Sequence, residues 1–268
     1  MRVSATGPVA SKVELRNVGL SYFGLEGETE ALKDISLSIA AGEFVAIIGQ
    51  SGCGKSTLLS LISGILKPTS GAVLVDGRSV AGPSTKVGYM LQQDYLFEWR
   101  TILENTVLGA EIQRADMTKA RERAAQLLTK YGLGRFLHYL PRQLSGGMRQ
   151  RVALARTLCT EPDVVLLDEP FSALDSQTRL ALADEVAEIL RREAKTAILV
   201  THDIGEAISM AERIIVLSRR PGQVRSDHSI RFATPDGTRP TPFAARNTPE
   251  FNRYFNVLWQ ELEVHVEG

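Results

Sequence analysis

The chain has 268 residues, and its 31 lysines and arginines balance its 31 aspartates and glutamates, so its formal net charge is zero. This length fits one globular domain, and 44% hydrophobic residues supply a large core, which excludes a natively disordered chain. The balanced charge argues against a nucleic-acid binder that works through a broad basic surface. Apolar runs such as 164–167 and 214–217 have four residues each, whereas a membrane-spanning helix needs about 20. We therefore expect a chain that does not cross a membrane alone and carries no signal peptide.

An antiparallel β layer is predicted at the start of the fold, which we expect to begin near Lys12 after a flexible leader over residues 1–11. Three segments place apolar residues at alternating positions, as half-buried strands do. These segments are 13–15, 35–39 and 71–75.

A parallel α/β core is predicted for the rest of a domain that we expect to span residues 12–245. The apolar run 44–48 leads into a glycine-rich turn and a segment with helical spacing up to Leu66, which is typical of a buried strand that feeds a helix. Helical periodicity with charged faces predicts a helical lobe over about 93–160. Strand-like runs return at 164–167, 197–200 and 214–217, separated by helical stretches at 176–193 and 204–211.

One more helix is predicted within the segment 246–268. Thr248 can cap it, Pro249 suits its first position, and Glu250 lies near the positive end of the helix dipole. Its apolar residues form one stripe, which packs either on the domain itself or on a partner. The stripe consists of Phe251, Tyr254, Phe255, Leu258 and Leu262.

A phosphate-binding loop is indicated between the strand at 44–48 and the helix that follows it. The sequence there matches the pattern G-x-x-x-x-G-K-[ST], whose backbone N–H groups surround nucleotide phosphates. Lys55 supplies a positive charge, and Ser56 offers a hydroxyl to Mg²⁺. The predicted fold is thus an α/β phosphate-loop NTPase core with a parallel sheet, an N-terminal antiparallel β layer and an inserted helical lobe. The predicted nucleotide-binding residues are Gly49, Gln50, Ser51, Gly52, Cys53, Gly54, Lys55, Ser56 and Thr57.

Two adjacent carboxylates follow the apolar run 164–167, at the end of a strand where ligands of parallel sheets bind. Asp168 can hold Mg²⁺, directly or through water. Glu169 is then left to accept a proton from the attacking water. Alone, such a pair would indicate only a strand that enters a solvated loop, but its pairing with the phosphate loop favours catalysis.

A second anion site is indicated by the segment 144–151, Leu-Ser-Gly-Gly-Met-Arg-Gln-Arg, which precedes a helical stretch. Ser145, Gly146 and Gly147 at a helix start can bind an anion, and a simple cap and turn is the alternative. With these motifs in this order, the sequence resembles an ATP-binding cassette ATPase from about Lys12 onward. In that family Leu-Ser-Gly-Gly is the signature, and it contacts the nucleotide held by the opposite subunit.

The resemblance implies roles for further residues. Tyr22 lies where the family places an aromatic ring against adenine, although the adjacent Phe23 could stack equally well. Gln92 matches the glutamine that senses Mg²⁺ and water, with Gln93 as the alternative, and His202 matches the histidine that reaches the γ-phosphate. The loop expected at the dimer interface consists of Ser172, Ala173, Leu174 and Asp175.

The function that the resemblance implies is the peripheral ATPase subunit of an importer at the cytoplasmic face of the cell membrane. It would bind ATP and Mg²⁺ and form a homodimer or pair with a related subunit. It would also contact hydrophobic permease subunits and serve a solute-binding protein indirectly. Segments 97–105 and 218–222 and the C-terminal tail resemble importers of nitrate, sulfonates, taurine or pyrimidine precursors. Leu96, Phe97 and Trp99 either contact a permease helix or belong to the core.

Three other functions remain open, of which one, a phosphotransferase that uses the same loop on a small acceptor, would give the signature sequence no role. An ATPase of an exporter would have the same chemistry. Soluble cassette ATPases of DNA repair or translation usually carry two cassettes or a long coiled coil, whereas this chain has one copy of each motif.

Cys53 allows two interpretations. Its place beside Lys55 and a helix N-terminus favours a reactive thiolate that exceeds Cys159 in reactivity, and the alternative is a side chain that points away from solvent.

Overall fold

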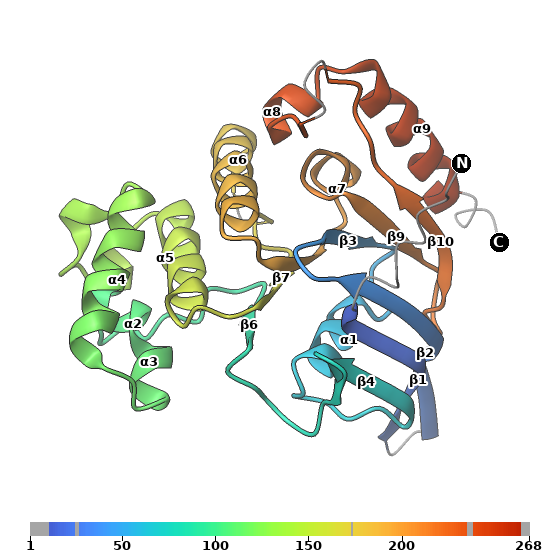
Figure 1. The fold of residues 1–268 in the computed structure, drawn as a ribbon, viewed down its shortest axis with the longest axis horizontal. Coiled ribbons are helices and arrows are strands. Elements are labelled where there is room, and N and C mark those ends of the chain that lie inside the picture. Colours follow the sequence, from blue (N-terminus) through green and yellow to red (C-terminus); the bar gives the residue numbers. More distant parts are fainter. Residues whose placement is uncertain (1–10, 25–26, 173, 235–237, 264–268) are drawn as a thin grey trace, which may run out of the picture.

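The computed structural model describes residues 11–24, 27–172, 174–234 and 238–263. These residues form two β-sheets beside a lobe of helices (Figure 1). The predicted leader ends one residue too late, since Ser11 already belongs to the first strand, and residues 1–10 lie outside the described part. Among the described residues, no helix is long and apolar enough to span a membrane.

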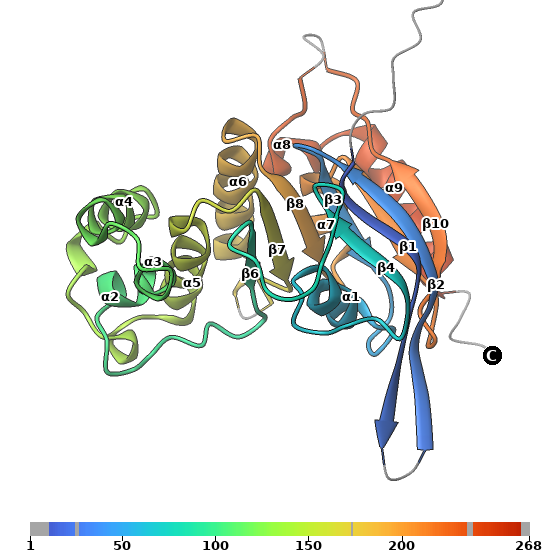
Figure 2. The same cartoon turned by 60° about the horizontal axis from the view of Figure 1, so that its bottom comes forward.

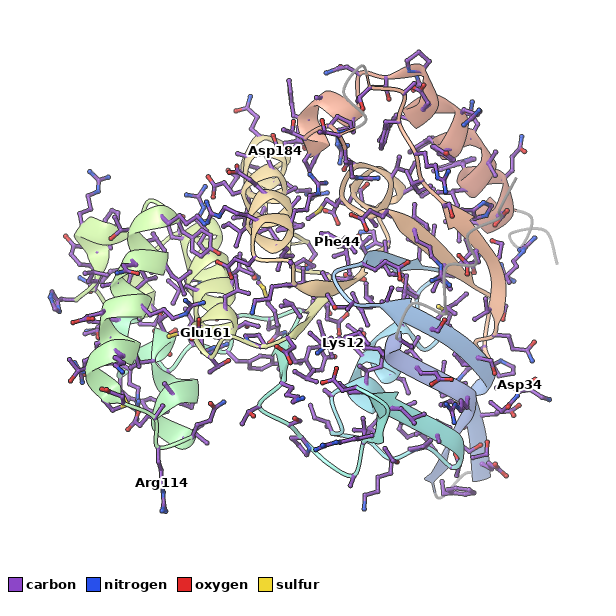
Figure 3. All side chains as sticks on the ribbon, in the orientation of Figure 1. Lys12, Asp34, Phe44, Arg114, Glu161 and Asp184 are labelled. Atoms are coloured by element: carbon purple, nitrogen blue, oxygen red, sulfur yellow. The ribbon has the colours of Figure 1, made fainter. Side chains whose placement is uncertain are left out.

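The smaller sheet is the predicted antiparallel layer, with the strand order β2-β1-β4-β5. Its first two strands form a long hairpin that extends beyond the rest of the molecule (Figure 2). Lys12, labelled in Figure 3, connects this sheet to the larger one, because its ammonium lies 2.8 Å from Asp76 and 3.1 Å from Asp163. The strands are β1 (Ser11–Gly24), β2 (Gly27–Ala40), β4 (Ser70–Val75) and β5 (Arg78–Ser79).

The larger sheet has the order β10-β9-β3-β8-β7-β6, and all neighbours are parallel except β10, which pairs antiparallel with β9. Its three central strands are fully buried because both faces are covered, which explains their continuous apolar sequences. Ala46 packs on one face, in the cluster with the lobe helices, and Val45 packs on the other, with the antiparallel sheet. The strands are β3 (Phe44–Ile48), β6 (Val87–Met90), β7 (Val164–Asp168), β8 (Thr196–Val200), β9 (Arg213–Leu217) and β10 (Val224–Ser229).

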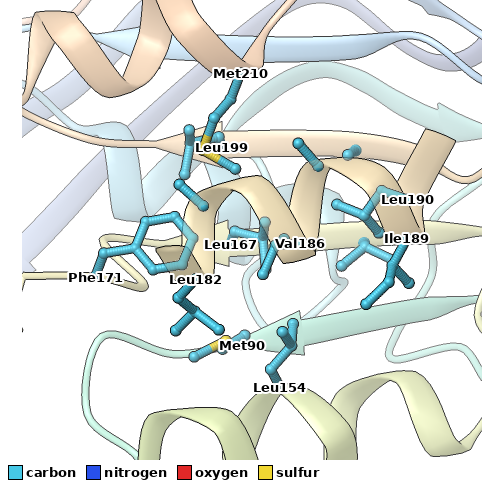
Figure 4. Packing of buried hydrophobic residues seen from close by; sticks show 14 of the residues in the cluster. Met90, Leu154, Leu167, Phe171, Leu182, Val186, Ile189, Leu190, Leu199 and Met210 are labelled. Carbon is cyan, nitrogen blue, oxygen red and sulfur yellow. The ribbon is translucent and has the colours of Figure 1, made fainter. Parts of the chain in front are cut away.

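The predicted helical lobe is present, and its core is continuous with one face of the larger sheet. Met90 and Leu154 lie beside Leu182 and Leu167 in one buried cluster (Figure 4). The lobe helices are α2 (Ile102–Thr106), α3 (Leu108–Ile112), α4 (Met117–Lys130) and α5 (Gly146–Cys159), with short 3₁₀ turns at Gly134–Phe136 and Pro141–Gln143.

The helix that follows the phosphate loop is shorter than predicted. It ends at Ile62 rather than Leu66, because Gly64 adopts a φ of 79° and turns the chain. This helix is α1 (Lys55–Ile62), and it shares a buried cluster with the antiparallel sheet. The remaining core helices are α6 (Ser176–Arg192), α7 (Ile204–Met210) and α8 (Pro242–Ala245).

The C-terminal helix α9 (Pro249–Glu263) packs against α7 and runs beside β10 (Figure 1). Thr248 caps it as predicted, since Thr248 Oγ1 accepts a hydrogen bond of 3.3 Å from the N–H of Phe251. Leu258 is fully buried, and the other stripe residues are at least partly buried in the same cluster, which supports packing on the domain itself. Val257 and Trp259 on its outer side are exposed.

Candidate functional site

The phosphate loop connects the end of β3 to the N-terminus of α1. Gly54, which precedes the helix, has a φ of 100°, and a Cβ there would lie 2.6 Å from Leu32 Cδ2. No side chain in the described part of the chain caps the helix, so its first N–H groups remain available to an anion. The loop therefore needs glycine at this position both for its backbone and for its close contact with β2.

A cavity of about 570 Å³ opens above this loop. Lys55 projects into the loop, where its ammonium donates to the carbonyl oxygens of Gly49 at 2.8 Å and Gln50 at 3.0 Å. The cavity brings together most of the predicted catalytic and loop residues. It is lined by Tyr22, Ala31, Ser51, Gly52, Gly54, Lys55, Ser56, Thr57, Gln92, Glu169, His202 and Arg220.

Three predicted loop residues are absent from the described lining of this cavity. Gly49 and Gln50 instead support Lys55 through their carbonyl oxygens. Cys53 is buried, and burial raises the pKa of its thiol although the charge of Lys55 opposes the shift. Burial therefore supports the alternative interpretation, a side chain that points away from solvent, because desolvation outweighs the nearby ammonium. Burial also raises the pKa of Cys159.

Asp168 and Ser56 form a pair of oxygen ligands at the end of β7. Asp168 Oδ1 accepts a hydrogen bond of 3.0 Å from Ser56 Oγ, and Asp168 Oδ2 accepts one of 3.2 Å from Tyr89. Burial raises the pKa of Asp168, and these two hydrogen bonds oppose that shift. A carboxylate and a hydroxyl that face each other beside the phosphate loop fit Mg²⁺, which prefers oxygen ligands and retains several waters.

Glu169 lies between two polar side chains from neighbouring strand ends. Gln92, just after β6, donates from Nε2 to Glu169 Oε2 at 3.0 Å, and His202 Nδ1, just after β8, lies 3.3 Å from Glu169 Oε1. Glu169 itself has a φ of 45°, and its N–H donates to Val200 O at 2.8 Å. The carboxyl ends of three parallel strands thus bring together the predicted proton acceptor and two groups that hold its carboxylate. The structure directs the amide nitrogen of Gln92 to Glu169, and its predicted contact with Mg²⁺ remains a proposal.

The cavity also shows which of two adjacent residues can contact the nucleotide, for the aromatic pair 22–23 and the glutamine pair 92–93. Tyr22 lines it, with its hydroxyl 3.3 Å from Thr57 Oγ1, whereas Phe23 is 73% exposed and absent from the described lining. Similarly, Gln92 lines this cavity and contacts Glu169, whereas Gln93 is absent from its described lining and faces a neighbouring hollow that Gln92 also borders.

Sequence reasoning missed two lining residues, Ala31 on β2 and Arg220 in the turn between β9 and β10. The segment 218–222 did attract attention as a resemblance to importers, but its sequence contains no phosphate-binding pattern. The structure brings it to the cavity because the N–H of Gly222 donates to Ala31 O at 2.9 Å.

The signature residues lie away from this cavity, in the lobe. Ser145 caps α5 by accepting from the N–H of Met148 at 3.3 Å, and Gly146 and Gly147 form its first turn. A Cβ at Gly147 would lie 3.3 Å from Leu174, so the signature packs closely on the loop expected at the dimer interface.

The loop at 172–175 connects this region to the catalytic carboxylate. Ser172 Oγ donates to Glu169 O at 3.0 Å, Leu174 is buried, and Asp175 caps α6. Ala173 lies outside the described residues. The contacts of this loop within one chain are structural, and its role between subunits remains a proposal.

The residues proposed to face a permease behave differently from one another. Leu96 is buried and belongs to the core, whereas Trp99 is 75% exposed and stacks on Phe97 with ring centroids 4.9 Å apart. Leu91 and Tyr95 are also exposed beside Gln92.

Comparisons with known proteins agree with this geometry. A family model described as ABC transporter matches residues 32–172. An uncharacterized ABC transporter ATP-binding protein, YtlC of Bacillus subtilis, is 44% identical over 94% of this chain and 96% of its own length. The taurine import ATP-binding protein TauB of Pelagibacter ubique is 40% identical over 82% of this chain and 83% of its own. The nitrate import ATP-binding protein NrtD of Synechocystis is 39% identical over 92% of this chain and 93% of its own.

A solved structure matches the fold. It is the dimeric post-hydrolysis state of the ATP-binding cassette MJ0796 bound to ADP and Pi, with a TM-score of 0.74 and 37% identity. The match covers 82% of this chain and 100% of the other.

Proposed function

Because the chain belongs to the ABC transporter family and is an ATPase of that family, we propose that it powers solute import as a peripheral subunit of a membrane transporter. The proposed solutes are nitrate, a sulfonate, taurine or a pyrimidine precursor. The main observation in support of ATP hydrolysis is that Glu169 lies between Gln92 and His202, in the same cavity as Lys55. The names of the taurine and nitrate relatives support the solute class.

The proposed hydrolysis follows from the placement of these side chains. Lys55 and the first N–H groups of α1 hold the β- and γ-phosphates. Glu169 accepts a proton from water as the water oxygen attacks the γ-phosphorus and the bond to the bridging oxygen breaks, leaving ADP and phosphate. Gln92 and His202 keep the carboxylate of Glu169 in one orientation. Ser56 and Asp168 would hold Mg²⁺, which when bound neutralises charge on the phosphates.

A dimer is proposed because the signature residues lie outside the cavity of their own chain. Ser145, Gly146 and Gly147 present a capped helix start that is exposed or half-buried. A second subunit in the opposite orientation would bring these residues to the phosphates and the loop at 172–175 to the interface. The dimeric state of the MJ0796 cassette supports this arrangement.

Contact with a permease is proposed for the exposed side chains of Leu91, Tyr95 and Trp99, together with Phe97, which stacks on Trp99. Leu91 adjoins Gln92 in the chain, and Tyr95 lines a hollow together with Gln92. Movement of a membrane subunit there could therefore be transmitted to the carboxylate of Glu169. We propose that the subunit is thereby held at the cytoplasmic face of the membrane.

The test is reconstitution of the chain with its co-encoded membrane subunits in lipid vesicles. We expect ATP-dependent accumulation of one of the four solutes in the importing direction and none with Glu169→Gln. Trp99→Asp should reduce retention on the vesicles without loss of ATP hydrolysis by the free subunit. Phe243→Asp, at a 58% exposed position on α8, is the control and should be retained. Transport in the opposite direction would establish an exporter, and hydrolysis without any binding to membrane subunits would favour a soluble cassette.

A further inference from the structure

The C-terminal end of α9 is joined to the phosphate loop through the side chain of Gln50. Gln50 Nε2 donates to the carbonyl oxygen of Leu262 at 3.1 Å, and Gln50 Oε1 accepts from Arg219 Nε at 2.8 Å. We propose that Gln50 is a positioning residue through which the end of α9 sets the conformation of the phosphate loop and thereby the affinity for ATP. This inference rests on the part of the proposed function that places ATP at Lys55.

The end of α9 is a fixed anchor. The last carbonyl groups of a helix have no partner within the helix, and they carry the negative end of its dipole. Gln50 satisfies the carbonyl of Leu262, and Arg225 Nη1 donates to the carbonyl of Glu261 at 2.7 Å. The Glu261 carboxylate also contacts Ser226 and lies 3.0 Å from His228 Nε2, both on β10. Side chains from two distant segments therefore hold one helix end in place.

On its other side, Gln50 is held by Arg219, which lies in the turn between β9 and β10, and this turn is itself held in place. Gly222 in this turn exchanges backbone hydrogen bonds with β2, at 2.9 Å to Ala31 O and 3.0 Å from the N–H of Lys33. A Cβ at Gly222 would lie 2.2 Å from Cys53 O, so the turn packs directly on the phosphate loop. Because its two neighbours hold its amide from both sides, Gln50 has little freedom to change rotamer.

The backbone of Gln50 carries this restraint to the phosphate site. Its carbonyl oxygen accepts from Lys55 Nζ at 3.0 Å and from the N–H of Cys53 at 3.2 Å. A shift of Gln50 therefore changes the acceptors that position the ammonium of Lys55. Two hydrogen bonds, joined by the covalent bonds of Gln50, therefore connect the carbonyl of Leu262 to Lys55.

Such coupling is reciprocal. If loosening the end of α9 weakens ATP binding by some factor, then bound ATP must strengthen the docking of α9 by the same factor. Coupling of this kind usually changes affinity by about 5- to 150-fold. We expect Gln50→Leu, which keeps similar bulk and loses both hydrogen bonds, to raise the dissociation constant for ATP at least about fivefold.

The matched control is Tyr254→Phe. Tyr254 is also on α9, and its hydroxyl bonds to the backbone of Arg231, with 3.2 Å to the N–H, away from the phosphate loop. This variant removes a docking contact of the same helix but not the link to Gln50, so its ATP affinity should stay within about twofold of the unmodified chain. Equal losses of affinity in the two variants, or none in Gln50→Leu, would overturn the inference.

Hydrogen exchange of the unmodified chain gives a second test that needs no variant. The amides in the last turn of α9 should exchange at least about fivefold more slowly when a fluorescent ATP analogue or ATP occupies the site. Exchange that is unaffected by nucleotide would refute the coupling. Both tests use the isolated chain, so their failure together with successful transport in vesicles would contradict only the coupling of α9 to ATP. Successful coupling in a chain that transports nothing would contradict only the proposed import.

Discussion

Replacement of Tyr22 by alanine tests the side of the cavity that should receive the adenine ring. The tyrosine lines the cavity, and its hydroxyl lies 3.3 Å from Thr57 Oγ1 at the start of α1, so the ring is held over the phosphate loop. Phe23 follows it directly and points elsewhere, with 73% of its surface exposed. The two neighbours therefore form a natural pair of test and control.

The expected loss of ATP affinity in Tyr22→Ala follows from the exposure of the tyrosine ring. Stacking of a base on an aromatic side chain contributes about 1–3 kcal/mol. Tyr22 remains 43% exposed, which leaves a free surface for the base but also keeps solvent nearby, so we expect the lower part of this range. A loss of about 1–2 kcal/mol corresponds to about a 5- to 30-fold higher dissociation constant for ATP.

Titration with a fluorescent ATP analogue, competed by unlabelled ATP, measures this change. Tyr22→Phe should retain most of the affinity because it keeps the ring, and Phe23→Ala should bind like the unmodified chain. A larger loss in Phe23→Ala than in Tyr22→Ala would refute the assignment of the adenine side.

Three further predictions concern catalysis, stability and reactivity. Glu169→Gln should bind ATP but release phosphate about 10²- to 10⁴-fold more slowly, because the proton acceptor is lost. A dimer that depends on Mg-ATP should accumulate in size-exclusion chromatography of this variant, and normal turnover would show that Glu169 is not the proton acceptor. Leu258→Ala, at a fully buried position of α9, should lower the free energy of unfolding by about 2.7–5 kcal/mol in denaturant titrations. Val257→Ala, on the exposed side of the same helix, should change it by less than about 0.5 kcal/mol, and equal effects of the two variants would contradict the packing of α9. Cys53 and Cys159 should both resist a brief maleimide treatment of the native chain at neutral pH, because both thiols are buried and their raised pKa values lower the fraction of thiolate. Peptide mapping that finds rapid labelling of Cys53 would contradict this.

The sequence allowed prediction of those site residues that directly follow buried strands. Glu169 and His202 each come just after a fully buried strand, and parallel strands deliver such residues to one edge of the sheet. Gln92 follows the half-buried strand β6, which the sequence did not indicate, so only the resemblance identified it.

The choice between Tyr22 and Phe23 could not be made by counting along the strand. The pairing of β1 with β2 shifts register between Leu15 and Val18 and again near Leu20, so the alternation that begins at Val13 does not continue to the tip of the hairpin. Only the folded hairpin shows which of the two rings faces the cavity.

Long-range contacts account for the other omissions. Arg220 reaches the cavity because its turn pairs with β2, and the side chain of Gln50 meets a helix more than two hundred residues later. Strand β10 was missed because its sequence is polar and lies at the sheet edge. The choice between the two interpretations of Cys53 also needed the structure, because the local rule for thiolates ignores packing. A Cβ at Gly49 would lie 2.7 Å from the sulfur of Cys53, so the thiol is enclosed by the loop.

Glu169 has a left-handed backbone conformation, which lowers the stability of the fold but places the carboxylate that hydrolysis requires. A residue with a side chain in this conformation costs about 1–2 kcal/mol relative to one in an ordinary helical conformation, whereas glycine adopts it freely. Glycine has no carboxylate, so selection for a more stable fold and selection for hydrolysis favour different residues at position 169. The conformation persists because Val200 O and Ser172 hold the backbone on both sides. Substitutions that weaken the pairing of β7 with β8 should therefore impair turnover before they unfold the chain.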